Sequence, residues 1–387
     1  MEIIQVAGKN TVKEFHDLAE KIYKDDPNYI PSLRVMVEDV FNPDKNAKYK
    51  IGDARRWILK RKNKCIGRIA AFYDEDYSSG YDQPTGGCGF FECVDDQQAA
   101  ELLFDTAKDW LQSNGMKAMD GPINFGENFF NWGLLISGFR PQTFGMQYHP
   151  KYYLKLFENY GFKIYYNQLS YSMDITNPDL PERFWKIAAW MAQKPGYSFE
   201  HFSFKKQDQY LRDFIEIHKK AWKSHGNYKP AKFDQLKEML QQAKIILDEE
   251  FIWFVYHEGN PVGFFMMIPD LNQIIQKLES DKMNLLNYLK LLYYKKKKVM
   301  TRCRVIVLGV VPKFQRMGIE SGIFHKLKAV MLRKSWYNDM EMSWVGDFNP
   351  KMMAMFKSFG ADHVLTHATL RYLFDRKKEF KKAPIID

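Results

Sequence analysis

The sequence of 387 residues has few cysteines and lacks a long apolar run. Cys65, Cys88, Cys93 and Cys303 are not spaced with histidines as metal ligands are, so we expect reduced structural thiols and no metal site. No window approaches the roughly 18 apolar residues of a membrane-spanning helix. The chain also does not begin with a basic stretch followed by an apolar one. We therefore expect no membrane span, no signal peptide and a cytoplasmic location.

Familiar catalytic patterns are missing as well. The chain shows no Ser-His-Asp order, no zinc-ligand spacing and no Walker loop, and its nine histidines are scattered. His325 falls within a helical segment, where we expect it to be packed rather than catalytic. The sequence therefore gives no indication of a triad hydrolase, a zinc enzyme or a Walker-type nucleotide hydrolase.

Composition and charge narrow the class of protein further. Hydrophobic residues make up 45% of the chain and charged residues 27%, a globular balance, and the length suits two domains. The net charge of +10 favours an anionic partner, which can be a phosphorylated cofactor, a nucleic acid or a lipid surface. The densest basic cluster, Lys295 to Lys298, ends an amphipathic segment. We interpret it as a solvated helix end, and a nucleic-acid partner is not predicted.

Two segments of the chain resemble each other. Trp57 opens WILKRKNKCIG and Trp253 opens WFVYHEGNPVG. Each segment has a strand, a polar turn and a second strand that restarts at a glycine, Gly67 or Gly263. Apolar runs follow both, so each segment predicts a β-hairpin.

Further features recur in the same order. HPKYYLKLFENYGF (149–162) and NPKMMAMFKSFGA (349–361) each read as a short helix closed by an aromatic residue and glycine. Both halves also begin with a strand followed by a helix. The chain is therefore predicted to hold two copies of one α/β unit with a mixed sheet, joined near NPDLP (177–181), which gives domains 1–178 and 179–387.

The two copies differ in their middle. The first has the strand GCGFFECV and a long helix whose start carries Asp95 and Asp96. Carboxylates at a helix start cap the helix and occupy the place of a bound anion, so this helix is predicted to be structural. The second copy has the strand CRVIVLGVV, the turn PKFQRMG and then a helix. There Gly318 lets the backbone approach a ligand, Arg316 adds charge, and unpaired N–H groups can face a pyrophosphate. An ordinary strand-to-helix connection is the alternative.

These residues resemble the GNAT acyltransferase superfamily. VVPKFQRMGI is similar to its pyrophosphate loop, with Val310, Pro312, Gln315 and Gly318 matching and Glu320 departing from the usual small residue. NPKMMAMFKSFGA is similar to its closing motif. There Asn349 and Gly360 match, and Phe356 stands where a tyrosine is common. The whole order resembles tandem GNAT-like bacterial proteins with a degenerate first half.

The resemblance implies two tandem GNAT-like domains and an acyl-coenzyme A donor, acetyl-coenzyme A first among the candidates. It implies an amine acceptor, either a small molecule or a peptide, and hence N-acyl transfer. The donor-binding residues that the resemblance indicates are Val310, Val311, Gln315, Arg316, Met317, Gly318, Ile319 and Asn349.

Acyl transfer needs a neutral amine, and an amine of pKa near 10.4 is mostly protonated at pH 7, so a general base helps. Glu341, at the start of the strand EMSWVGDFN, is the candidate base, and a solvated strand-end glutamate is the alternative. Phe356 cannot donate a proton to the leaving thiolate. Another tyrosine can replace the usual one, or the thiolate leaves unaided because its pKa is near 8.5.

Two segments remain for the substrate. Residues 121–139 combine glycines and aromatics, and Asn128, Asn131 and Trp132 are candidate substrate contacts, with a buried glycine-rich turn as the alternative. Residues 271–294 form an insertion whose apolar stripe is expected to be core, although it can also cover an acyl chain. Two other functions stay open. One is a Fem-like transferase that uses aminoacyl-tRNA, and the other is a non-catalytic protein that binds coenzyme A or another ligand.

Overall fold

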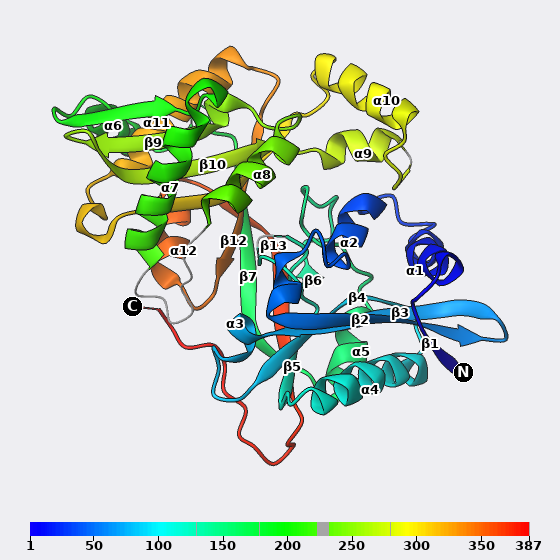
Figure 1. Cartoon of the computed structure of the whole chain (residues 1–387). Coiled ribbons are helices and arrows are strands. Elements are labelled where there is room, and N and C mark those ends of the chain that lie inside the picture. The colour runs from blue at the N-terminus through cyan, green and yellow to red at the C-terminus, as the bar shows by residue number, and fades with distance from the viewer. Residues whose placement is uncertain (129, 178, 223–231, 279, 387) are drawn as a thin grey trace.

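A computed structural model describes residues 1–386 apart from 129, 178, 223–231 and 279. It contains one mixed sheet of 13 strands with helices on both faces (Figure 1). The elements of the first half are β1 (Glu2–Gln5), α1 (Lys9–Ile22), α2 (Arg34–Val40), β2 (Gly52–Arg61), β3 (Lys64–Asp74), α3 (Glu75–Ser78), β4 (Thr85–Cys93), α4 (Gln97–Ser113), β5 (Ala118–Gly121), β6 (Leu134–Ser137), α5 (Tyr153–Tyr160) and β7 (Lys163–Met173).

The second half follows in the same order after an added helix. Its elements are α6 (Glu182–Met191), β8 (Tyr197–His201), α7 (Gln207–Trp222), α8 (Phe233–Ala243), β9 (Ile252–His257), β10 (Asn260–Pro269), α9 (Asn272–Leu278), α10 (Leu285–Lys296), β11 (Arg302–Val310), α11 (Ile319–Arg333), β12 (Asp339–Gly346), α12 (Pro350–Ser358) and β13 (Asp362–Leu373). The predicted α/β class, the hairpins β2–β3 and β9–β10 and the repeat of one unit are confirmed.

The strand order of the sheet reads nearly the same from either end. It runs β1-β2-β3-β4-β5-β13-β7-β12-β11-β10-β9-β8, with β6 pairing β13 to one side. Each half contributes five consecutive strands, and its final strand lies beside the fifth strand of the other half. The two copies are therefore related by an approximate twofold axis between β13 and β7.

The final strands tie the halves together. β13 pairs antiparallel with β5 and with β7, and β7 pairs antiparallel with β12. Figure 1 shows β7 and β13 in the middle of the molecule, between the blue-to-cyan first half and the green-to-orange second half. The division into domains 1–178 and 179–387 stays a prediction, because the two halves complete a single sheet.

Separate apolar cores support the two halves. In the first, Leu103, Phe104 and Leu111 of α4 are fully buried against β3 and β4, on the face of the helix that meets the sheet. In the second, Phe324 of α11 packs edge-on against Phe265 of β10. Each helix thus fixes its own N-terminus at the end of the preceding strand.

Candidate functional site

The connection from β11 to α11 is a long surface loop. It runs from Val311 to Gly318, and Gln315, Arg316 and Met317 are exposed. The Gln315 side chain turns back and donates a hydrogen bond from Nε2 to the carbonyl oxygen of Val310, 3.1 Å away. Arg316 has a φ of 63°, so the chain bends sharply just before the helix. Val310 and Ile319, at the ends of the loop, are buried and hold it in place.

The helix α11 begins at a bare glycine. Gly318 is its N-cap residue with a φ of 84°, and no side chain among the described residues caps it. A Cβ atom at Gly318 would lie 3.8 Å from the nearest atom, Cγ2 of Ile187, so a side chain has room but the backbone conformation disfavours one. The first N–H groups of a helix lack partners within the helix and favour negative charge. This end of α11 can therefore hold an anion.

Glu320 lies in the first turn of α11. Its side chain is half-buried. Burial raises the pKa of the Glu320 carboxyl above its ordinary value, and the hydrogen bond from its own backbone N–H partly offsets the rise. The carboxylate thus lies close to the same N–H groups that an anion would use.

The strands β11 and β12 pair along only part of their length. Their parallel ladder covers Arg302–Val305 opposite Asp339–Met342, while β11 continues to Val310 paired with β10. Three residues in this outer part of β11, Ile306 to Leu308, are only partly buried although the strand is central in the sheet. The outer part of β11 therefore has no ladder to β12 among the described residues, and the glycine loop lies at its end.

The corresponding place in the first half is closed. β4 and β5 pair over Thr85–Gly87 and Ala118–Asp120, after which the N–H of Ile123 bonds to the carbonyl of Cys88 at 2.9 Å. A Cβ atom at Gly89 would lie 1.9 Å from the carbonyl oxygen of Ile123, so the chain after β5 fills this space. Only residues 94–96 connect β4 to α4, and the Asp96 side chain accepts from the N–H of Ala99. The predicted capping carboxylate is confirmed, and it occupies the anion's position.

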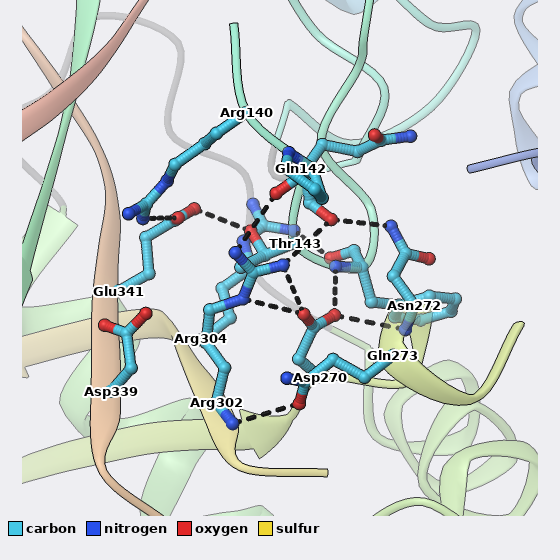
Figure 2. Close-up of polar contacts among 12 residues, drawn as sticks. Arg140, Gln142, Thr143, Asp270, Asn272, Gln273, Arg302, Arg304, Asp339 and Glu341 are labelled. Atoms are coloured by element: carbon cyan, nitrogen blue, oxygen red, sulfur yellow. Dashed lines mark hydrogen bonds and ion pairs between the residues drawn. The ribbon is translucent and has the colours of Figure 1, made fainter. Parts of the chain in front are cut away.

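Glu341 is fully buried where the two halves meet (Figure 2). Arg140 donates from Nη2 to Glu341 Oε2 at 2.6 Å, and the Thr143 hydroxyl donates to Oε1 at 2.6 Å. Both partners come from the loop between β6 and α5 of the first half. The alternative of a solvated strand-end glutamate is therefore wrong, while a role as base remains a prediction. The buried Nε of Arg140 has no hydrogen-bond partner among the described residues, so one donor beside Glu341 is unused.

A second ion pair secures the same loop. Asp270 is fully buried and accepts from Arg302 Nε at 2.8 Å and from the N–H of Phe144 at 2.8 Å. Arg302 also donates to the carbonyls of Pro141 and Gln142 (Figure 2). Burial raises the pKa of the Asp270 carboxyl, and the charge and hydrogen bond of Arg302 offset the rise only in part. Charged groups of the second half thus fix the backbone that carries Arg140 and Thr143.

Arg304 is on β11, opposite Glu341 of β12, and has no exposed surface. Its Nε donates to the hydroxyl of Ser343 at 2.7 Å, and its Nη1 donates to the carbonyl of Phe144 at 2.7 Å. Burial lowers the pKa of Arg304 to about 10, although the negative charges of Glu341 and Asp270 oppose this. The guanidinium remains charged at neutral pH and braces the strands where their ladder ends.

Asp120 of β5 occupies the position in the first half that Glu341 occupies in the second. Matching the hairpin glycines Gly67 and Gly263 aligns Gly87 with Arg304, and these residues pair with Asp120 and Glu341 respectively. Asp120 is also fully buried, and Arg371 of β13 donates to both its oxygens at 2.6 and 2.7 Å. Each half therefore has a buried carboxylate that is paired with an arginine from the other half.

A cavity lies in the first half, on the other side of the loop that contacts Glu341. Residues of α1, the α1–α2 connection, β4 and the segment 142–149 line it. Glu92 on its wall accepts from the Tyr153 hydroxyl at 2.7 Å, and burial raises the pKa of its carboxyl. Gln142 also lines the cavity. Its Nε2 donates to Ile30, while its buried Oε1 has no partner among the described residues.

The predicted substrate residues lie in the segment that closes the first half. Asn128 is exposed, and its backbone carbonyl oxygen accepts a hydrogen bond from Nε1 of Trp344 at 3.1 Å. Asn131 lines the cavity, whereas Trp132 is buried and donates from Nε1 to the Tyr166 hydroxyl at 3.0 Å. Asn349 caps α12 through a bond from the N–H of Met352. Asn128, Asn131 and Trp132 thus have different surroundings although they are close in the chain, and their roles toward a substrate, like the role of Asn349 toward the donor, remain predictions.

Sequence reasoning missed the charged cluster around Glu341. Its members are Arg140, Thr143, Asp270, Arg302 and Arg304. A signal was present in Arg304, because an arginine inside an apolar strand such as CRVIVLGVV is rare unless it is paired. The sequence alone could not identify the partners, since Arg140 and Glu341 are 201 positions apart.

Comparison with solved structures defines the class of fold. A tandem GNAT protein from the clavulanic acid biosynthesis pathway matches with a TM-score of 0.59 at 10% identity, covering 97% of this chain and 99% of that one. A GCN5-related N-acetyltransferase from Sphaerobacter thermophilus matches with a TM-score of 0.54 at 11% identity over 98% of both chains. The chain therefore has the tandem GNAT fold, as the sequence predicted.

Two curated proteins are similar over almost the whole chain. The bacterial ceramide synthase of Caulobacter vibrioides is 27% identical over 379 residues, which cover 95% of this chain and 96% of the relative. Protein YghO of Escherichia coli is 27% identical over 362 residues, or 92% of this chain and 91% of the relative. No family model matches the sequence.

Proposed function

We propose that the chain is an N-acyltransferase that takes an acyl group from coenzyme A and binds this donor in its second half. One observation carries the proposal. The helix α11 begins at Gly318 without a side-chain cap, and it follows the strand β11, whose outer part is not paired with β12. The pyrophosphate would bind the N–H groups of residues 318–321, with the exposed Arg316 nearby. The first half lacks both features, which supports a single donor site per chain.

The open edge of β11 suits the amide-bearing arm of coenzyme A. Main-chain N–H and C=O groups of Ile306 to Leu308 can pair with the two amides of that arm, as a strand edge pairs with a peptide. From Val310 back to Val305 the strand spans about 17 Å at its normal rise. An extended arm along this edge brings the thioester close to Arg304 and Glu341.

The acceptor amine would approach from the cavity of the first half. The segment 140–149 separates this cavity from Glu341, with Arg140 and Thr143 on one side and Gln142 on the other. The unpaired Oε1 of Gln142 is an acceptor for an amine or hydroxyl hydrogen, and Nε of Arg140 is a donor for a substrate oxygen. Both carboxylate oxygens of Glu341 already accept hydrogen bonds. The reaction therefore requires that the hydrogen bond from Arg140 or from Thr143 is replaced by one from the substrate amine.

The proposed reaction is an aminolysis of a thioester. The neutral amine attacks the carbonyl carbon, the new C–N bond forms and the C–S bond breaks. One proton of the amine passes to Glu341, and coenzyme A leaves as its thiolate, which then takes up that proton and becomes the free thiol. The products are an amide and free coenzyme A.

The relative's name favours a lipid-like pair of substrates. A ceramide is an amide between a fatty acid and a long-chain amino alcohol, and one relative is a bacterial ceramide synthase. We therefore favour a fatty acyl-coenzyme A as donor and a long-chain amino alcohol as acceptor. Acetyl-coenzyme A with a small or peptide amine is the alternative from the sequence.

A matrix of donors and acceptors tests the proposal. The purified chain is incubated with acetyl-, octanoyl- or palmitoyl-coenzyme A and with a long-chain amino alcohol, a short amine or a lysine peptide. Thiol release and the mass of the amide are measured, and titration calorimetry gives the stoichiometry. We expect one bound donor per chain and the fastest thiol release for the palmitoyl donor with the amino alcohol. Binding without turnover for every pair would favour a non-catalytic protein, and no binding would contradict the donor site.

A further inference from the structure

The helix α10 carries an unusual amount of exposed apolar surface. Leu285, Leu286 and Leu289 are 76%, 61% and 54% exposed, and three further apolar or aromatic side chains on the helix are also exposed. These three are Tyr288, Leu292 and Tyr293. Only Asn287 and Leu291 of this helix are buried. Soluble proteins rarely leave such a patch uncovered unless it binds something.

The helix is firmly attached to the molecule. The Asn284 side chain caps its start by accepting from the N–H of Asn287, and Asn287 donates to the carbonyl of Lys282 at 2.8 Å. Leu291 packs into the core of the second half, and the Lys295 ammonium bonds to the carbonyl of Ile245. Figure 1 shows α9 and α10, in yellow, beside the rest of the second half rather than beneath other elements. The exposed face is therefore a preformed surface.

The charged side chains of α10 itself are all positive. Lys290 on the helix and Lys296 to Lys298 at its end are exposed, whereas α10 itself contains no acidic residue. The nearest preceding carboxylate, Asp281, is already paired with Arg34 at 2.5 Å. The Lys297 ammonium lies over the ring of Tyr293, 5.8 Å from its centroid. Leucines flanked by exposed tyrosines and lysines have the composition of helices that lie in the interface of a bilayer.

We propose that α10 docks onto an anionic lipid bilayer, with its leucines among the acyl chains and its lysines at the headgroups. A second copy of the chain fits this face less well, because two such faces would bring their lysines together. The connection between β3 and β4 in the first half spans only residues 75–84, whereas residues 270–301 connect β10 and β11. The docking helix thus belongs to an extension that the second half alone carries.

The position of α10 relates the bilayer to the cavity. Asp281, just before α10, lines the cavity, and Arg34 beside it opens α2, whose Val35 is 51% exposed. A bilayer at α10 would therefore lie near the mouth of the cavity. If the proposed function holds, a membrane-borne amine could enter from there, but docking itself requires neither donor nor turnover.

Vesicle co-sedimentation tests the docking without any substrate. The full chain is mixed with vesicles of phosphatidylcholine alone or with added phosphatidylglycerol, at low and high salt. We expect at least about tenfold tighter binding to the anionic vesicles, weakening as salt rises. No binding to either vesicle would overturn the proposal, whatever the outcome of the acyl-transfer assay.

Matched variants separate the apolar and the charged contributions. The triple change Leu285→Ser, Leu286→Ser and Leu289→Ser should reduce binding at least about tenfold on anionic vesicles. Lys296→Gln, Lys297→Gln and Lys298→Gln together should remove most of the preference for phosphatidylglycerol. Leu102→Ser with Leu332→Ser, which alters exposed leucines of α4 and α11, is the control and should bind as the parent does.

Sedimentation velocity and thermal melting complete the test. We expect the parent and the leucine variant to have the same association state without lipid. We also expect the melting temperatures of the variants to equal that of the parent. A parent that self-associates without lipid, and that the leucine variant dissociates, would identify the occupant as a second copy and overturn the proposal. If the triple variant melts early, the single change Leu286→Ser is used, and its binding must still fall.

Discussion

Both halves of the chain have a parallel strand pair followed by a helix start at the same position in the fold. The strand pair is closed and the helix is capped in the first half, and neither is the case in the second. In the first half Ile123 follows β5 and bonds to β4, and Asp96 caps α4 after a connection of residues 94–96. In the second half the ladder stops at Val305, and Gly318 begins α11 without a cap. The comparison teaches that the fold by itself does not provide an anion site. In the first half, the short turn with its cap Asp96 and the chain after β5 at Ile123 fill the place of this site.

The same contrast holds for the two buried carboxylates. Asp120 and Glu341 are equivalent in register, yet Asp120 is held at both oxygens by the nearly buried Arg371. Glu341 is shared between Thr143 and the partly exposed Arg140. The first arrangement is a rigid internal ion pair. The second one can open, because Arg140 can turn toward solvent.

The largest expected effect is on the stability of the first half. Asp120→Asn leaves the Arg371 guanidinium buried without its counter-charge, which should lower the free energy of unfolding by about 3–5 kcal/mol. Urea denaturation followed by circular dichroism measures it. Glu216→Gln, which removes an exposed pair with Lys220, is the control and should cost less than about 1 kcal/mol. An unchanged midpoint for Asp120→Asn would contradict the structural role of the pair.

The next effect concerns the helix start of the second half. Gly318→Asp imitates the carboxylate of the first half, so coenzyme A affinity should fall at least about a hundredfold, or about 2.7 kcal/mol. Gly115→Asp is the matched control, because Gly115 has a φ of 82° and open space around it at the end of α4. Calorimetry on both variants decides. Equal affinities would mean that the donor does not bind at α11.

Glu341→Gln should separate catalysis from binding. The amide keeps the shape of the side chain but cannot take the amine proton, so kcat should fall about ten- to a hundredfold, or 1.4–2.7 kcal/mol. Coenzyme A affinity should stay near the parent value, whereas the melting temperature should fall, because Arg140 and the buried Arg304 lose a counter-charge. A variant with full activity would make Glu341 a structural link between the halves and leave the base unidentified.

Removing the cap of the first half should not create a second site. Asp96→Ala should cost about 1 kcal/mol of stability, because the N–H of Ala99 loses its acceptor. The donor stoichiometry should remain one per chain, since Ile123 still closes the space beside β4. A stoichiometry of two would show that the cap alone excludes the donor.

The smallest effect is expected at Glu320. Glu320→Gln should tighten coenzyme A binding by about 0.3–1 kcal/mol at low salt, because a half-buried negative charge leaves the helix start. The pKa of Glu320 is raised by burial, so lowering the pH neutralises it earlier than an ordinary glutamate. Parent affinity should therefore approach that of the variant as the pH falls. Affinities that differ equally at all pH values and salt concentrations would exclude the electrostatic explanation.

Local features of the molecule could be predicted from the sequence. The hairpins, the capped helix of the first half and the glycine-bearing loop depend on residues close together in the chain, and their patterns identify them. The insertion was predicted only in part. Ile274 and Ile275 of α9 lie in the core as expected, whereas most apolar residues of α10 apart from Leu291 are exposed. Periodicity reveals an apolar stripe but does not tell whether anything covers it.

Contacts between the halves could not be predicted. Each final strand pairs with the fifth strand of the other half, so that β13 lies beside β5 and β7 lies beside β12. The sequences of β7 and β13 would read as strands with either partner, so they do not indicate this exchange. The cluster around Glu341 depends on that exchange and on a loop that donates Arg140 across the boundary. Where this loop lies in the folded chain depends on tertiary structure, and local patterns in a single sequence do not predict it.

The exchanged strands have a consequence for how the protein can be divided. A fragment that ends after β7 would leave β5 with an unpaired edge and Asp120 without Arg371, while the remaining fragment would offer β13 and lack β7. Each piece would thus display the edge that the other one completes. A chain cut between β7 and α6 should stay together as a non-covalent complex, and the separately made pieces should refold only when mixed.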